Sequence, residues 1–82
     1  MTILEAVQSK FAEILEIDLP DPDTDIYDLG GDSAQAVQIA LELEVDLGVA
    51  IPLETFEEDS TPRAVAAWIE RKLQTSPQAA AG

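Results

Sequence analysis

The segment best suited to carry chemistry is Leu29-Gly30-Gly31-Asp32-Ser33, at the start of an expected helix. Two glycines permit a sharp and sterically open turn, and this turn presents the Ser33 hydroxyl at the helix N-terminus. Because the free N–H groups and the dipole of a helix N-terminus favour an anion, a phosphate attached to Ser33 would be stabilised there. Local physics leaves a second interpretation open, in which Ser33, or Asp32 beside it, serves only as the helix cap.

A catalytic role for Ser33 is disfavoured by the composition of the chain. There is no His to take a proton from the serine hydroxyl, and there is no Cys to act as another nucleophile. A chain of 82 residues also leaves little room for a deep substrate pocket beside its core. We therefore predict that the protein is not an enzyme.

The acidic segment before Ser33 imitates the first half of a calcium loop. Asp21, Asp23 and Asp25 occupy positions 1, 3 and 5 of an EF-hand pattern. The pattern then fails, because Ile26 stands where the loop needs glycine and Asp32 stands where it needs a bidentate glutamate. We predict no specific metal site here and only loose attraction of divalent cations.

The helix expected over 33–47 carries two apolar stripes on nearly opposite sides. A surface helix of a small bundle needs only one such stripe. The second stripe is therefore either buried as well or left exposed as a docking surface, rimmed by carboxylates, for partners with basic patches. One stripe consists of Ala36, Ile39, Ala40, Leu43 and Leu47, and the other of Ala34, Val37, Leu41 and Val45.

Caps mark the first two of the helices that must position these residues. Thr2 and Glu5 form a capping-box pattern at the start of a periodic apolar segment, which predicts a helix over about 3–16. The helix over 33–47 ends where Gly48 can adopt a left-handed backbone.

Two further helices follow. A short helical turn is expected over 53–58, with Phe56 as its apolar anchor. The hydroxyl–hydroxyl–proline sequence Ser60-Thr61-Pro62 predicts the start of a last helix that runs to about residue 74. The predicted fold is all-α, a small four-helix bundle of three main helices plus one short helix.

A long loop is expected over 17–32, between the first two helices. The loop contains four apolar residues, and we expect their side chains to hold it against the core: Ile17, Leu19, Ile26 and Leu29.

Charge restricts the possible partners. The chain has 17 acidic and 4 basic side chains and a net charge of −13. Nucleic acids and anionic membranes are excluded as partners, because phosphate contacts need clustered lysine and arginine. Partner proteins with basic patches are favoured instead. No secretory signal or membrane-spanning segment is evident, so we expect a soluble, cytoplasmic and monomeric protein.

The turn at Ser33 and the helix after it resemble the phosphopantetheine attachment site of acyl carrier and peptidyl carrier proteins. The resemblance extends over residues 3–74 and includes the segment from Leu43 to Pro52 and the Ser-Thr-Pro start of the last helix. It implies a carrier domain over 1–74, followed by a disordered tail over 75–82. It also implies that a phosphopantetheinyl transferase attaches 4'-phosphopantetheine from coenzyme A to Ser33, and that the arm holds acyl or aminoacyl groups as thioesters.

The resemblance also implies a partner-binding face beside the arm. By motif position this face consists of Asp32, Ala34, Val37, Leu41 and Glu44, whereas Ile39, Leu43 and Leu47 would lie in the core. The implied partners are the transferase and enzymes with basic docking patches that load, transfer, extend or tailor the carried group.

Compared with the family pattern, Ala34 replaces the larger aliphatic residue that usually follows the serine, which indicates an altered fit to partners. Gln38 and Val45 replace residues that are usually acidic in fatty-acid carriers, and together with the paired glycines and the segment 52–56 they favour polyketide or nonribosomal peptide biosynthesis. The strong negative charge and the short length favour a discrete subunit. The alternatives are a fatty-acid-type carrier, an unmodified acidic helical adaptor and a calcium-binding helix–loop–helix protein.

Overall fold

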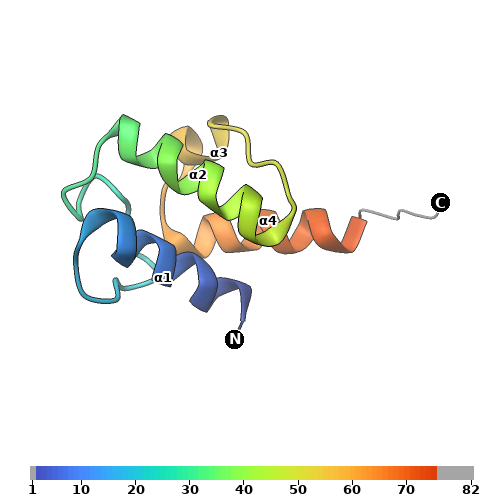
Figure 1. The fold of residues 1–82 in the computed structure, drawn as a ribbon, viewed down its shortest axis with the longest axis horizontal. Coiled ribbons are helices and arrows are strands. Elements are labelled where there is room, and N and C mark those ends of the chain that lie inside the picture. Colours follow the sequence, from blue (N-terminus) through green and yellow to red (C-terminus); the bar gives the residue numbers. More distant parts are fainter. Residues whose placement is uncertain (1, 76–82) are drawn as a thin grey trace.

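The computed structural model describes residues 2–75, which form four helices and no strand (Figure 1). The helices are α1 (Ile3–Leu15), α2 (Ser33–Leu47), α3 (Glu54–Glu58) and α4 (Pro62–Thr75). The predicted all-α architecture of three longer helices and one short helix is confirmed. No helix in this part of the chain is long and apolar enough to cross a membrane.

Local hydrogen bonds define the ends of the first two helices. Thr2 Oγ1 accepts from Glu5 N at 3.0 Å and Glu5 Oε1 accepts from Thr2 N at 2.9 Å, so the predicted capping box is formed. Helix α1 ends at Leu15, one residue earlier than expected, because Glu16 adopts a left-handed backbone with φ 58°. Gly48 ends α2 in the same region, with φ 72°, where glycine has no steric cost.

The last two helices also begin close to the predicted positions. Helix α3 starts one residue later than expected, and α4 starts at Pro62. The Thr61 hydroxyl accepts from Ala64 N at 3.1 Å and so caps α4. Thr75, which the sequence assigned to the tail, is the last residue of α4, and the rest of the predicted tail, 76–82, lies outside the described residues.

The core is built by packing α1 against both α2 and α4, with α3 packed against α4 (Figure 1). The rings of Phe11 and Phe56 stack at its centre, with centroids 6.4 Å apart. Phe56 therefore anchors a helix that is too short to be stable alone. The buried apolar residues are Val7, Phe11, Ile26, Ala36, Ile39, Ala40, Leu43, Ile51, Phe56, Val65, Ala66 and Ile69.

The long loop is attached to the start of α4 by backbone hydrogen bonds. Ile26 is fully buried, as expected, and its N–H donates to the carbonyl oxygen of Ser60 at 3.3 Å. Arg63 N donates to the carbonyl oxygen of Pro22 at 3.0 Å. Leu29 packs against the core from the same loop. The position of the segment before Ser33 is therefore fixed by contacts far away in the sequence.

One expected anchor of the loop is wrong. Leu19 is 62% exposed, and the neighbouring Pro20 is buried in its place. In an extended chain, successive side chains point to opposite sides, so only one of the two can face the core. The buried side chain of Gln8 selects Pro20, because its Nε2 donates to the Pro20 carbonyl oxygen at 2.9 Å.

Candidate functional site

Ser33 is the first residue of α2, and its side chain is exposed. The helix cap is provided by Asp32, whose Oδ1 accepts from Gln35 N at 2.9 Å. Gln35 Oε1 accepts in return from Asp32 N at 3.1 Å, which completes a capping box. The interpretation in which Ser33 serves as the cap is therefore wrong. Within residues 2–75, the Ser33 hydroxyl has no hydrogen-bond partner and is available for modification.

The two glycines before Asp32 are required for different reasons. Gly30 has a φ of 90°, which strains any L-amino acid with a side chain, although the space around it is open. At Gly31 a Cβ atom would lie 2.6 Å from Ile26 Cγ1 and 2.9 Å from Leu15 Cδ2. Gly31 N also donates to the Ile26 carbonyl oxygen at 2.8 Å. One glycine makes the turn and the other lets it pack against the core.

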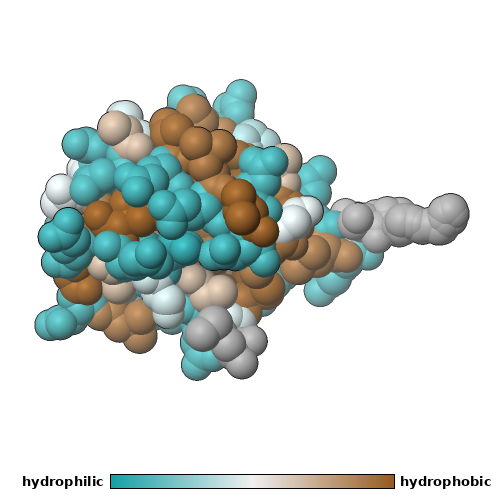
Figure 2. All heavy atoms as spheres, viewed as in Figure 1, coloured by the Kyte–Doolittle hydropathy of each residue, from teal (hydrophilic) through white to brown (hydrophobic). Residues whose placement is uncertain are grey.

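The two stripes of α2 differ clearly in exposure. In the core stripe Ile39 and Leu43 are 0% and 1% exposed, and Leu47 packs at the edge of the core. In the second stripe Leu41 is 58% and Val45 82% exposed. Figure 2 shows hydrophobic residues exposed among mainly hydrophilic ones on the face of the molecule where α2 lies in front. The second stripe is therefore an exposed apolar surface.

Four of the five residues predicted to bind partners lie on α2 and the fifth, Asp32, is its N-cap, and we call these five residues the docking face. Asp32, Ala34, Leu41 and Glu44 are exposed and Val37 is half-buried. No intramolecular ion pair forms at Glu44 within the described chain, so its charge faces solvent. Val45 extends the docking face toward the C-terminal end of α2, as its place in the second stripe predicts.

A cavity of about 100 Å³, which we call the Ser33 cavity, lies between the start of α2 and α3. The residues that line this cavity together with Ser33 could not be predicted from the sequence, because no local pattern shows that α3 packs beside Ser33. Its mixed apolar and polar lining suits the first part of a group attached to Ser33. The lining residues are Tyr27, Ser33, Ala36, Val37, Leu53, Phe56 and Glu57.

Lys10 neutralises one side of α2 and leaves the docking face acidic. Its Nζ lies 3.0 Å from Asp46 Oδ2, 3.2 Å from Glu42 Oε1 and 3.4 Å from Glu13 Oε1. The hydrogen bond to Asp46 is the largest cause of a Lys10 pKa above its usual value, so Lys10 stays charged. Between Lys10 and Arg63 the sequence has no basic residue, although 15 of its 17 acidic residues lie there. Asp32 directly before Ser33 and Glu57, which lines the Ser33 cavity, make the surroundings of Ser33 negative.

The acidic loop uses its carboxylates for structure. Asp23 Oδ1 accepts from Arg63 Nε at 2.7 Å, and this hydrogen bond holds the pKa of Asp23 below its usual value. Asp21 Oδ1 accepts from Asp23 N at 2.7 Å, and Asp25 Oδ1 accepts from Asp28 N at 2.8 Å. Among residues 2–75, no group of three or more potential ligands is placed to hold a metal ion.

A four-helix bundle with an exposed serine at the start of its second helix is the arrangement expected of a carrier domain. Residues 5–69 match the family described as the phosphopantetheine attachment site. The chain therefore belongs to this family, which includes the acyl carrier and peptidyl carrier proteins. The prosthetic group of the family is 4'-phosphopantetheine, and the exposed Ser33 hydroxyl, the open space at Gly30 and the Ser33 cavity fit such a group.

The proteins to which this chain is similar include a peptide synthetase and an acyl carrier protein. Over 67 residues, which are 82% of this chain, the sequence is 39% identical to the probable non-canonical nonribosomal peptide synthetase CymA of Salinispora arenicola. The chain spans 1% of that protein's length. The fold is similar to that of BlmI, a type-II acyl-carrier-protein from Streptomyces verticillus involved in bleomycin biosynthesis, with a TM-score of 0.82 and 22% identity. That likeness covers 87% of this chain and 86% of BlmI.

Proposed function

We propose that the protein carries acyl or aminoacyl intermediates on a 4'-phosphopantetheine arm attached to Ser33. The observation that supports this most directly is the exposed Ser33 hydroxyl at the start of α2, beside a cap that Asp32 provides. Asp32 satisfies Gln35 N, and within residues 2–75 the N–H groups of Ser33 and Ala34 at the start of α2 have no acceptor. Free N–H groups at a helix N-terminus favour an anion such as a phosphate on the serine oxygen.

In this proposal the chain supplies the serine that holds the arm, and its partner enzymes supply the catalysis. In the loading step, Ser33 Oγ attacks the phosphorus next to the pantetheine arm of coenzyme A. The pyrophosphate bond breaks, adenosine 3',5'-bisphosphate leaves, and the proton of the serine hydroxyl passes to a base of the phosphopantetheinyl transferase. The thiol of the attached arm supplies the thioester chemistry. The protein provides no general base for this step, and the partner enzymes perform the catalysis. We place the protein in the cytoplasm, where coenzyme A is available.

We further propose that the protein serves nonribosomal peptide or polyketide assembly as a discrete subunit. The similar segment of CymA belongs to a peptide synthetase, and BlmI acts in bleomycin biosynthesis. Gln38 and Val45, both exposed on α2, support this choice over a fatty-acid carrier, which would carry acidic residues at these positions. A fatty-acid carrier would use the same serine and would differ in the enzymes that load it.

The docking face is proposed to meet these enzymes. Leu41 offers an exposed apolar contact, and Asp32 and Glu44 offer charges to a basic rim. Because the side chain of Ala34 is small, a partner surface can extend closer to α2 directly beside Ser33. The transferase and the loading, acyl-transferring, extending and tailoring enzymes are all expected to use this face.

Intact-mass measurement tests the attachment site. The protein is incubated with coenzyme A, magnesium and a broad-specificity phosphopantetheinyl transferase, and we expect a gain of one phosphopantetheinyl group. Ser33→Ala should abolish the gain while the helical circular-dichroism signal persists. Ser9→Ala is a matched control, because Ser9 is also an exposed helical serine, and it should be modified like the original chain. An unchanged mass with several transferases would support the unmodified adaptor instead.

A further inference from the structure

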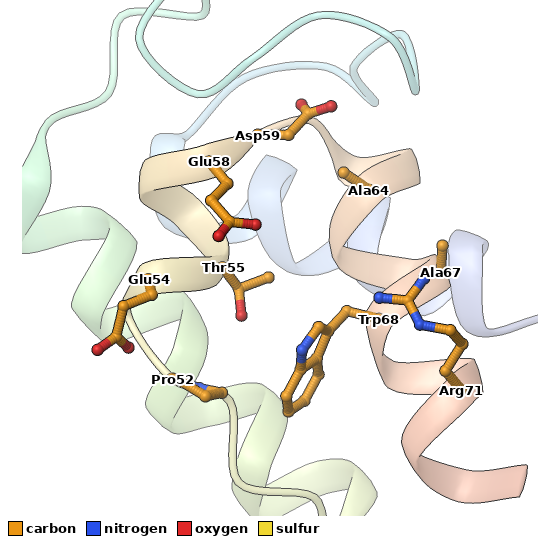
Figure 3. A pocket seen from close by; sticks show the side chains of 9 residues that line it. All are labelled: Pro52, Glu54, Thr55, Glu58, Asp59, Ala64, Ala67, Trp68 and Arg71. Atoms are coloured by element: carbon orange, nitrogen blue, oxygen red, sulfur yellow. The ribbon is translucent and has the colours of Figure 1, made fainter. Parts of the chain in front are cut away.

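A groove of about 450 Å³ lies between α3 and α4, separate from the Ser33 cavity. We call it the acidic groove. Figure 3 shows Glu58 and Thr55 directed toward the space between the two helices, with Trp68 and Arg71 on the opposite wall and the carboxylates of Glu54 and Asp59 at its outer edges. The groove is open to solvent, and none of its lining residues is shared with the Ser33 cavity. It is lined by Pro52, Glu54, Thr55, Glu58, Asp59, Ala64, Ala67, Trp68 and Arg71.

The short helix α3 divides the two hollows. Leu53 and Glu57 line the Ser33 cavity, whereas Glu54 and Glu58 line the acidic groove. Phe56, which also lines the Ser33 cavity, is 3% exposed and holds α3 against the core. The first part of a group attached to Ser33 can therefore lie in the Ser33 cavity without entering the acidic groove. The Ser33 cavity and the acidic groove can be occupied by different ligands at the same time.

Trp68 gives the groove an aromatic wall. It is the single tryptophan of the chain, it is half-buried, and Figure 3 shows its indole directed toward the space below Thr55. Lys72 Nζ lies 5.5 Å from the centroid of its ring, so the indole already interacts with one cation. Tryptophan at an open, half-buried position is typical of the centre of a protein–protein contact.

The rim on the α3 side is negative. The carboxylates of Glu54 and Glu58 are exposed and form no ion pair within residues 2–75. Asp59 adds a third charge, although its Oδ1 also accepts from Thr61 N at 3.2 Å. The only basic residue of the lining is Arg71, on α4. Lys72 also lies beside the Trp68 ring, so both cations are on the α4 side and the three carboxylates are on or directly after α3. This separation favours a cationic occupant at the α3 side.

We propose that the acidic groove binds a basic segment of a partner protein, with an arginine side chain placed between Trp68 and the carboxylates of Glu54 and Glu58. Charge complementarity selects a basic partner, and the aromatic wall selects a guanidinium, which stacks on indole better than an ammonium. An open groove does not enclose a small molecule as a ligand pocket does, so a side chain of a macromolecule is the fitting occupant. The contact tethers the carrier while the Ser33 face stays free.

Binding can be followed through Trp68 fluorescence, because no second tryptophan contributes. The probe is the blocked peptide acetyl-Ala-Arg-Leu-Arg-amide, compared with the same peptide containing citrulline in place of each arginine. We expect the arginine peptide to shift the Trp68 emission and to saturate, and the citrulline peptide to have little effect. Titration calorimetry of the same samples gives the dissociation constant independently of the fluorescence.

Matched charge variants separate the groove from the general attraction of an acidic protein for a basic peptide. Glu54→Gln with Glu58→Gln should raise the dissociation constant about fivefold or more. Glu16→Gln with Asp18→Asn removes the same charge from an exposed region away from α3 and should change it by less than about twofold. Equal weakening by both pairs, or equal binding of the citrulline peptide, would overturn the proposal. Ser33→Ala should leave peptide binding unchanged, so this test is independent of the carrier function.

Discussion

Leu41 and Leu43 stand two residues apart on α2 and lie in opposite environments, 58% and 1% exposed. Leu→Ala at both positions changes helix propensity equally, so a difference between the variants reports on the side-chain surroundings. Leu43→Ala removes buried methyl groups and leaves a cavity, which should cost about 2–5 kcal/mol. Leu41 has about two-fifths of its surface buried, so its share of a full leucine burial is about 0.6–1.3 kcal/mol.

Equilibrium unfolding in urea measures both variants, with the helical circular-dichroism signal as the probe. Since 1 kcal/mol shifts the midpoint of thermal unfolding by about 4–8 °C in a domain of this size, a thermal scan resolves the difference as well. If Leu43→Ala does not fold, Leu43→Met keeps the volume and should cost less than about 1.5 kcal/mol. Equal destabilisation by Leu41→Ala and Leu43→Ala would show that the second stripe is buried and would refute the docking face.

Three further predictions concern residues outside α2. Lys10→Met keeps the apolar stem but leaves three carboxylates without their cation, so unfolding should become easier by about 1 kcal/mol, and added salt should reduce this loss. Gly31→Ala should destabilise the fold by about 1–3 kcal/mol in a urea titration, because the new Cβ would overlap Ile26. Arg63→Gln should raise the pKa of Asp23 toward its usual value, as followed by carboxyl NMR titration, because the hydrogen bond that lowers this pKa is lost.

The Asp23 prediction has a direction in pH. A carboxyl group whose pKa is lower in the folded state stabilises the fold above its usual pKa, and this contribution is lost as the pH falls through the folded value. Arg63→Gln should therefore reduce stability at neutral pH and flatten its decline below about pH 4. A pH–stability curve parallel to that of the original chain would show that the Asp23–Arg63 pair contributes nothing to stability.

For Lys10→Met, a loss of stability that salt does not change would contradict the electrostatic explanation.

Local signals were sufficient to predict the helices. The cap at Thr2 and the left-handed Gly48 each act within a few residues of themselves, so the sequence shows them directly, and for α2 it restricts the cap to Asp32 or Ser33. The attachment of the long loop could not be predicted in the same way. The hydrogen bond from Gln8 to the Pro20 carbonyl joins distant segments, and no periodicity marks such a pair.

The candidate site was predictable in part. Periodicity identified both stripes of α2, but it could not decide whether Leu41 faces solvent, because this depends on where the other helices pack. The cavity beside Ser33 and the groove beside Trp68 depend on the placement of α3, a helix of five residues that the core anchors through Phe56. A side chain that flanks an apolar stripe, as Trp68 does, gives no sign in the sequence of the space it lines.

The segment without a basic residue between Lys10 and Arg63 has a consequence for encounter rates. It covers α2, α3 and the long loop, so the positive charges of the molecule are confined to the side of α1 and α4. Such a separation gives the molecule an electric moment, and the field of a basic partner turns it before the surfaces touch. Two copies approaching with their Ser33 sides facing each other are repelled. Orientation in the field therefore selects collisions with partner enzymes over collisions between carriers, and added salt should weaken this selection by slowing association.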